Sequence, residues 1–166
     1  MYIIDQAKQL SLISEMKQLR KNSTSYEVYY HHPFTNQMWK SFFPKANGDN
    51  LGPKLLRHEP MPAKIEERLN ICLNENEPEN AIGLGIECSA KPSLWIPIIQ
   101  ALEKNYSQYD RKQLKLFLKH LDIDESREVY SESDAGDSID TISSDEINKL
   151  IWRSRKVRMK RFFVLG

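Results

Sequence analysis

Carboxylates are concentrated in one stretch of this chain, between Leu121 and Glu146. Eight of them form the candidate partner-binding set: Asp122, Asp124, Glu125, Glu128, Glu132, Asp134, Asp137 and Asp140. Asp145 and Glu146 follow, and Arg127 is the one cation in the stretch. Carboxylates at this density could bind a divalent cation, or they could attract and pair with the lysines and arginines of another protein.

The first acids of the stretch partly match a calcium-binding loop. Oxygen-bearing side chains alternate over residues 122–128, as the ligands of such a loop do. However, Arg127 occupies the position that needs glycine, and Ser133 occupies the position that needs a bidentate glutamate. The pattern predicts at most a weak, nonspecific cation site, so we expect no dedicated metal site and no cofactor.

Two further patterns that could support chemistry are weak. Gly83 and Gly85 match the start of a dinucleotide-binding loop, but Cys88 stands where the third glycine belongs. His31 and His32 are adjacent, so in a strand they point to opposite faces and cannot form an acid and base pair without a bend.

The remaining histidines and the cysteines favour structural roles. His58 and His120 are isolated in sequence, and a lone histidine is more often a hydrogen-bonded or surface residue than a catalyst. Cys72 and Cys88 lie sixteen positions apart in apolar patterns, which indicates reduced, buried thiols. The sequence therefore predicts that the protein is not an enzyme.

The C-terminal stretch is as basic as the preceding one is acidic. Seven cations and no acid follow Glu146: Lys149, Arg153, Arg155, Lys156, Arg158, Lys160 and Arg161. With Trp152, Phe162 and Phe163 they could bind phosphates and stack on single-stranded bases, or the arginines could complement the negative pole of a helix. The net charge of +1 gives no general attraction to a polyanion, so nucleic-acid binding is the less favoured of the two interpretations.

Length and composition indicate an ordinary globular protein. The chain has 166 residues, of which 40% are apolar and 28% charged. No apolar run approaches the roughly 18 to 20 residues that cross a bilayer. Residues 1–6 do not begin a signal peptide, so we expect a cytoplasmic protein without a membrane partner.

Periodicity in the first half predicts a helix, a hairpin and a second helix. Good helix formers over Asp5–Lys21 predict the first helix. Aromatic and β-branched runs at Tyr26–His31 and Met38–Phe43 predict a hairpin with a longer loop. A loop follows at Asn47–Pro53. A helix opened by Pro62 buries a 3.6-residue stripe, made of Ile65, Leu69, Cys72 and Leu73.

In the second half, apolar residues alternate over Ala81–Cys88 and predict a strand, against whose glycines another element packs closely. Helices are expected after Pro92, over Asp110–Leu121 and after Ser143, and a last strand over Arg161–Leu165. Residues 122–144 are expected to form a mobile loop. The predicted fold is therefore a single α+β domain over residues 1–166, with a small, mostly antiparallel sheet flanked by four or five helices.

The chain resembles bacterial toxin immunity proteins, including those of contact-dependent inhibition, in its general organisation. The features that carry the resemblance are the expected strand-to-helix stretch 81–95, the aromatic hairpin 26–43 and one strongly acidic element. The resemblance implies a non-catalytic protein that neutralises a cognate toxin, such as a cationic nuclease, by covering its active site. The eight carboxylates would then steer the toxin and pair with it.

Three alternatives remain open. The acidic stretch could be a solvated loop that packs against the basic tail, the tail could bind nucleic acid, or the chain could be a small enzyme. The sequence does not indicate an oligomeric state.

Overall fold

A computed structural model describes residues 1–46, 50–123 and 144–163. The chain divides into two compact units, Met1–Ala63 and Lys64–Gly166, and each is described by itself. The predicted α+β class with an antiparallel sheet is confirmed, while the prediction of a single domain stays a prediction. Within the described ranges, no helix is both long and apolar enough to span a bilayer.

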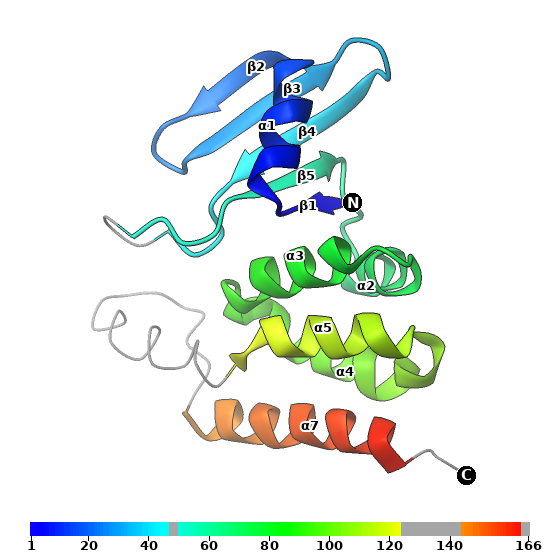
Figure 1. Cartoon of the computed structure of the whole chain (residues 1–166). Coiled ribbons are helices and arrows are strands. Elements are labelled where there is room, and N and C mark those ends of the chain that lie inside the picture. The colour runs from blue at the N-terminus through cyan, green and yellow to red at the C-terminus, as the bar shows by residue number, and fades with distance from the viewer. Residues whose placement is uncertain (47–49, 124–143, 164–166) are drawn as a thin grey trace. The chain divides into compact units, whose positions relative to one another are not determined.

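The first unit is a sheet with one helix (Figure 1). Its strands are β1 (Tyr2–Ile3), β2 (Lys17–Asn22), β3 (Glu27–His32), β4 (Gln37–Phe42) and β5 (Leu55–Glu59). They lie in the order β1-β5-β4-β3-β2, and each neighbouring pair is antiparallel. The predicted hairpin is confirmed as β3 and β4, and Asn36 accommodates a positive φ of 56° in its loop.

The predicted helix over Asp5–Lys21 is only half right. α1 (Gln6–Ser14) begins as expected, with the Asp5 side chain accepting a hydrogen bond from the Lys8 amide at 2.8 Å. Residues 17–22 instead form β2, because pairing with β3 overrides their helix propensity. β1 and β5 were not predicted. They extend the sheet beyond β4, at the edge opposite β2.

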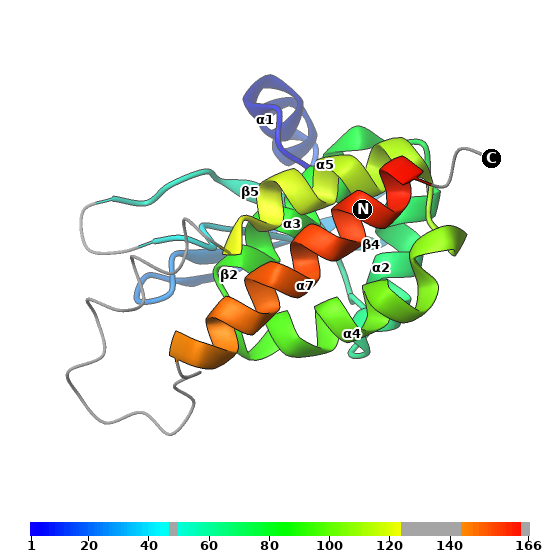
Figure 2. The same ribbon diagram turned by 90° about the horizontal axis from the view of Figure 1, so that it is seen from below.

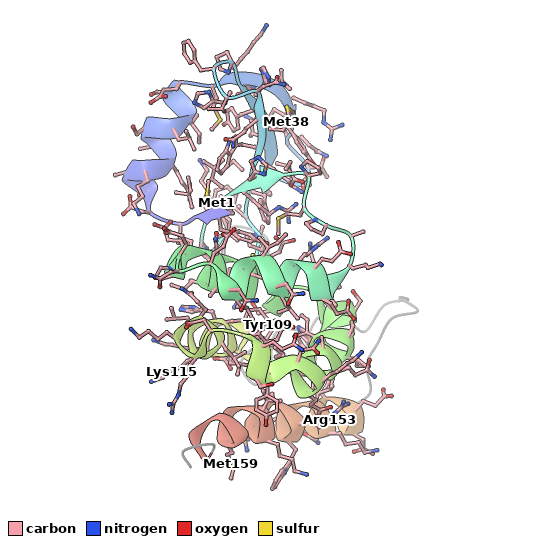
Figure 3. The ribbon with its side chains drawn as sticks, turned by 90° about the vertical axis from the view of Figure 1, so that its right-hand side faces the viewer. Met1, Met38, Tyr109, Lys115, Arg153 and Met159 are labelled. Carbon is pink, nitrogen blue, oxygen red and sulfur yellow. The ribbon has the colours of Figure 1, made fainter. Side chains whose placement is uncertain are left out.

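Gln9 fixes α1 against the sheet. Its side chain is buried, and Nε2 donates to the carbonyls of Ile3, Ile4 and Lys54 at 2.8, 3.3 and 3.0 Å. These carbonyls flank β1 and β5, so one amide ties the helix to both strands. Figures 1 and 3 show α1 lying over one face of the sheet, and among the described residues of this unit no helix or strand covers the opposite face.

The second unit is a stack of helices (Figures 1 and 2). The described helices are α2 (Ile65–Asn74), α3 (Pro78–Ser89), α4 (Trp95–Asn105), α5 (Arg111–Leu121) and α7 (Ser144–Phe163), with 3-10 turns at Pro92–Leu94 and Tyr106–Gln108. The predicted helix over Asp110–Leu121 is confirmed as α5, and Asp110 caps it, because its carboxylate accepts hydrogen bonds from the amides of Lys112 and Gln113 at 2.9 Å. The predicted apolar stripe of α2 is buried, and so are Leu114, Phe117, Leu118 and Leu121 of α5.

The predicted strand Ala81–Cys88 is wrong, since these residues form most of α3. Pro78 occupies the first turn, where its missing amide hydrogen is not needed. Close packing over the glycines was predicted correctly for Gly85. A Cβ built there would lie 2.9 Å from the His120 Cβ and 2.9 Å from the Phe117 carbonyl oxygen, so glycine lets α3 approach α5 closely.

The predicted final strand over Arg161–Leu165 is also wrong as far as the structure describes it. α7 continues through Phe163. Its buried side includes Leu150, Ile151 and Val157, and it packs on α4 and α5. The long helix therefore uses its apolar spacing within the second unit.

Candidate functional site

The acidic stretch connects two packed helices of the second unit. α5 ends at Leu121, Asp122 caps its C-terminus, and α7 begins at Ser144. Of the eight predicted partner-binding residues, the structure describes Asp122, which is half-buried. Seven lie outside the described residues: Asp124, Glu125, Glu128, Glu132, Asp134, Asp137 and Asp140. The predicted mobile loop over 122–144 likewise falls almost entirely outside the described residues.

Asp122 stands at the negative pole of α5, where a carboxylate is electrostatically disfavoured. Lys119 and His120 occupy the last turn of the same helix, and a cation there offsets that cost. Asp145 and Glu146 have the opposite situation, since they lie exposed in the first turn of α7, where acids are favoured. The acidic stretch therefore begins at an unfavourable helix end and finishes at a favourable one.

The first arginine of the basic stretch pairs with another helix. Arg153 donates from Nε to Glu103 Oε1 at 2.9 Å and from Nη2 to Glu103 Oε2 at 2.6 Å, which joins α7 to α4. The hydrogen bonds to Glu103 raise the pKa of Arg153, although partial burial opposes this. Among the described residues, the carboxylate that pairs with Arg153 thus comes from α4, outside the acidic stretch.

The outer face of α7 is apolar and cationic. Trp152 is 64% exposed and Met159 is 54% exposed, and Lys149 and Lys156 are exposed beside them. The side chains of Arg158, Lys160 and Arg161 lie outside those that the structure describes. Figure 2 shows α7 on the outside of its unit, and Figure 3 labels Arg153 and Met159 along it.

The histidines of the sheet are separated, as predicted for His31 and His32. His31 Nε2 lies 2.8 Å from Asn36 Oδ1, whereas His32 is buried on the other face with Nε2 3.6 Å from Glu15 Oε2. The Thr35 amide donates to His32 Nδ1 at 3.4 Å, so His32 joins the hairpin loop to the end of α1. These contacts give both histidines local structural roles.

His58 and the cysteines also contribute to packing. The His58 ring meets Trp39 edge to face, with centroids 5.4 Å apart. Cys72 and Cys88 are free and buried, which confirms the interpretation as core thiols. Burial, together with the neighbouring Glu87 carboxylate, raises the pKa of Cys88 to about 12, so its sulfur is protonated at neutral pH. Among the described residues, no group of three or more His, Cys, Asp or Glu side chains could hold a metal ion.

The sheet face opposite α1 carries a row of cations and aromatic rings that sequence reasoning missed. The strand register places Arg20, Tyr29, Lys40 and Arg57 next to one another across four strands. Arg20 Cζ lies 4.7 Å and Lys40 Nζ 5.6 Å from the centre of the Tyr29 ring, within the range of cation–π attraction. The row was not predictable because β5 was not recognised and β2 was assigned to a helix.

Carboxylates on the same sheet face balance part of this charge. Glu27 pairs with Lys40, and Glu59 pairs with Arg57. Burial raises the pKa of Glu27, but the hydrogen bond and charge of Lys40 outweigh burial and lower the pKa below its usual value. The face is thus a self-paired polar network, which favours a stabilising role.

A second missed cluster lies in the helical unit. The Glu87 carboxylate is 1% exposed, with Lys91 Nζ at 2.7 Å and Arg68 Nη1 at 3.9 Å. A buried carboxylate requires such partners, since an uncompensated charge in the interior is strongly destabilising. The alternating pattern assigned to a strand hid this cluster, because a strand would have placed Glu87 on the bare face.

The chain matches no protein-family model, no curated protein and no solved structure. The resemblance to toxin immunity proteins therefore stays a hypothesis.

Proposed function

We propose that this protein binds a cationic partner protein and inhibits it, as an immunity protein does to its toxin. The proposed contact is the stretch from Asp122 to Asp140, which would cover the active site of the partner. The observation that carries the proposal is the charge distribution of the sequence, in which ten carboxylates accompany a single arginine between Leu121 and Glu146.

The helices at both ends of the stretch support this role. α5 and α7 pack against each other in the second unit, so the chain enters and leaves the acidic stretch from one packed body. In general, a segment with both ends anchored loses less entropy on binding a partner than a free tail does. The arrangement is suited to presenting carboxylates to another molecule.

The contact between Arg153 and Glu103 supports it further. After Lys149, Arg153 is the next cation that follows the acidic stretch in the sequence. If the acids served only to neutralise the basic tail, Arg153 would be expected to pair with one of them. Arg153 instead donates both of its described hydrogen bonds to Glu103. One strong cation of the tail is therefore satisfied without a carboxylate from the acidic stretch.

Electrostatic steering provides the mechanism. Clustered carboxylates accelerate encounter with a positively charged surface, and association can reach about 10⁸ M⁻¹s⁻¹ at low salt. Ion pairs that become fully desolvated in the complex then slow dissociation, whereas pairs at the rim contribute little. No chemistry by this chain is needed for such inhibition.

The test measures association with a partner isolated by affinity capture from the source organism. The variant Asp134→Asn/Asp137→Asn/Asp140→Asn should associate more slowly than the wild type, and its rate should depend less on salt between about 50 and 200 mM, because steering is screened over about 8 to 10 Å at the higher end. Loss of three carboxylates removes attraction without changing side-chain size appreciably.

The matched control is Glu66→Gln/Glu67→Gln/Glu77→Gln, which removes three exposed carboxylates elsewhere in the same unit. It should retain the wild-type association rate and salt dependence. A triple Asp variant whose rate equals that of the wild type at every salt concentration contradicts the proposal, as does a captured partner whose contact surface carries no excess of cations.

A further inference from the structure

One surface of the second unit combines exposed apolar side chains with exposed cations. Lys149, Trp152, Lys156 and Met159 are spaced by three, four and three residues, so they form one stripe along α7. We call these four residues the outer stripe. The opposite side of the helix, with Leu150, Ile151 and Val157, is buried. Figure 2 shows that no other described helix of the second unit lies over the outer side of α7.

Trp152 differs from the other two tryptophans of the chain. Trp39 is 1% exposed and Trp95 is 0% exposed, and the Trp95 indole donates to the Cys88 carbonyl at 3.0 Å. Trp152, in contrast, leaves 64% of its surface in solvent. An indole normally buries much of its large apolar area, and exposed apolar surface that is rimmed by polar residues is typical of binding sites.

The cations of the outer stripe flank this indole on both sides. Neither Lys149 nor Lys156 forms an ion pair with any residue that the structure describes. The two lysines are separated by about 10 Å along the helix axis, a distance that about three stacked nucleotides of one strand would cover. Lys149 and Lys156 thus lie on either side of the exposed Trp152 ring, at a spacing that matches phosphates about three nucleotides apart in one strand.

The same charges argue against a second copy as the occupant. A second copy packed antiparallel about the middle of the Lys149–Lys156 segment would bring its Lys156 against Lys149, and like charges placed opposite each other in an interface repel. The stripe instead requires an anionic partner with a flat surface to cover the indole. A nucleobase with its phosphates supplies both.

We propose that the outer stripe of α7 binds single-stranded nucleic acid, with a base stacked on Trp152 and phosphates paired with Lys149 and Lys156. Stacking on an aromatic ring between cations tolerates any base, so the binding is largely independent of sequence. The overall charge of +1 does not oppose it, because beyond the first turn of α7, which carries Asp145 and Glu146, every charged residue of this helix is a cation. The residues of the site follow the acidic stretch in the sequence, and the proposal does not depend on the inhibitor function.

The test uses the intrinsic fluorescence of the full chain. Adding oligothymidylate or oligouridylate of about 12 nucleotides, within the site sizes of single-strand binding proteins, should quench the emission of Trp152. The buried Trp39 and Trp95 should not respond. Acrylamide should then quench the complex less than the free protein, because the base covers the indole.

Variants test whether the outer stripe is the binding site of the oligonucleotide. Binding is measured by the fluorescence anisotropy of a labelled oligonucleotide. Trp152→Ala should weaken binding about 5-fold to 100-fold. Lys149→Gln/Lys156→Gln should lower the slope of log K against log salt by about 0.7 for each lysine lost. Both changes are at exposed positions, so the variants should fold as the wild type does, which circular dichroism checks.

Lys115→Gln/Lys119→Gln is the matched control, because it removes two exposed lysines from α5. It should leave the affinity and the salt slope close to those of the wild type. The proposal is overturned if the oligonucleotide does not bind, if Trp152→Ala binds with unchanged affinity, or if polyglutamate quenches Trp152 while the oligonucleotide does not. The last result would assign the stripe to an acidic protein.

Discussion

Arg153 on α7 and Glu103 on α4 form a two-point ion pair that joins residues fifty positions apart in the sequence. The planar guanidinium matches both carboxylate oxygens, so the pair fixes the rotation of α7 as well as its distance from α4. The same rotation places Trp152, the preceding residue, on the outer face. The pair thus links the packing of α7 to the surface that α7 presents.

Arg153→Lys should destabilise the second unit by about 0.5 to 1 kcal/mol, because lysine keeps the charge but cannot make the paired hydrogen bonds. The expected loss is small since the two side chains are 35% and 33% exposed and solvent screens them. Urea unfolding measures the change. In a double-mutant cycle with Arg153→Ala and Glu103→Ala, the coupling energy should be about 1 kcal/mol, and a coupling of zero would show that the pair does not stabilise the folded protein.

Gly85→Ala should destabilise the second unit, although alanine is the better helix former by about 1 kcal/mol. The added Cβ would lie 2.9 Å from both the His120 Cβ and the Phe117 carbonyl oxygen, so α3 and α5 would have to separate. Overpacking of this kind costs about 1 to 3 kcal/mol. Thermal unfolding gives the sign directly. Gly85→Ser should be worse than Gly85→Ala, and a stabilised alanine variant would show that the close approach of the two helices is wrong.

His58 should make the stability of the first unit dependent on pH. Burial lowers the pKa of His58, the positive N-terminal amino group adds to this effect, and Glu59 opposes it. The unfolded chain therefore binds a proton at higher pH than the folded protein does. The contribution of neutral His58 to stability is complete above about pH 6.5 and falls as the pH drops from there toward the lower folded pKa.

The measurement is urea unfolding at several pH values between about 7.5 and 5, on either side of the ordinary histidine pKa. The wild type should lose stability on acidification, and His58→Gln should lose less, since glutamine has no proton to gain. An equally steep decline in His58→Gln would assign the pH dependence to other groups.

Local patterns predicted elements whose apolar stripe faces one side. In α5, Leu114, Phe117, Leu118 and Leu121 recur with the helical period, and Asp110 marks the start. In the β3–β4 hairpin, two aromatic runs flank a loop with turn residues. α5 buries one face and exposes the other, so its period is visible in the sequence, whereas the two hairpin strands are half-buried or buried at most positions and are recognised by their aromatic and β-branched composition.

The same reasoning failed for α3 because this helix is buried on nearly all sides. Its polar positions, including Asn80, Glu87 and Ser89, are buried together with the apolar ones. The 3.6-residue period is then hidden, and the chance alternation of Ile82, Leu84 and Ile86 resembles a strand. Pro78 was the available signal for a helix start.

The sequence alone determined the α+β class, the buried thiols and the charge distribution from which the inhibitor function is proposed, because these depend on composition and on local spacing. Only the tertiary structure decided that Lys17–Asn22 is a strand and that Arg153 pairs with Glu103, since both depend on partners distant in the chain. It also decided that Trp152 is exposed while Trp39 and Trp95 are buried. The identity of an aromatic residue does not show whether its side chain is exposed. Its exposure depends on which face of its helix or strand the other elements of the fold cover.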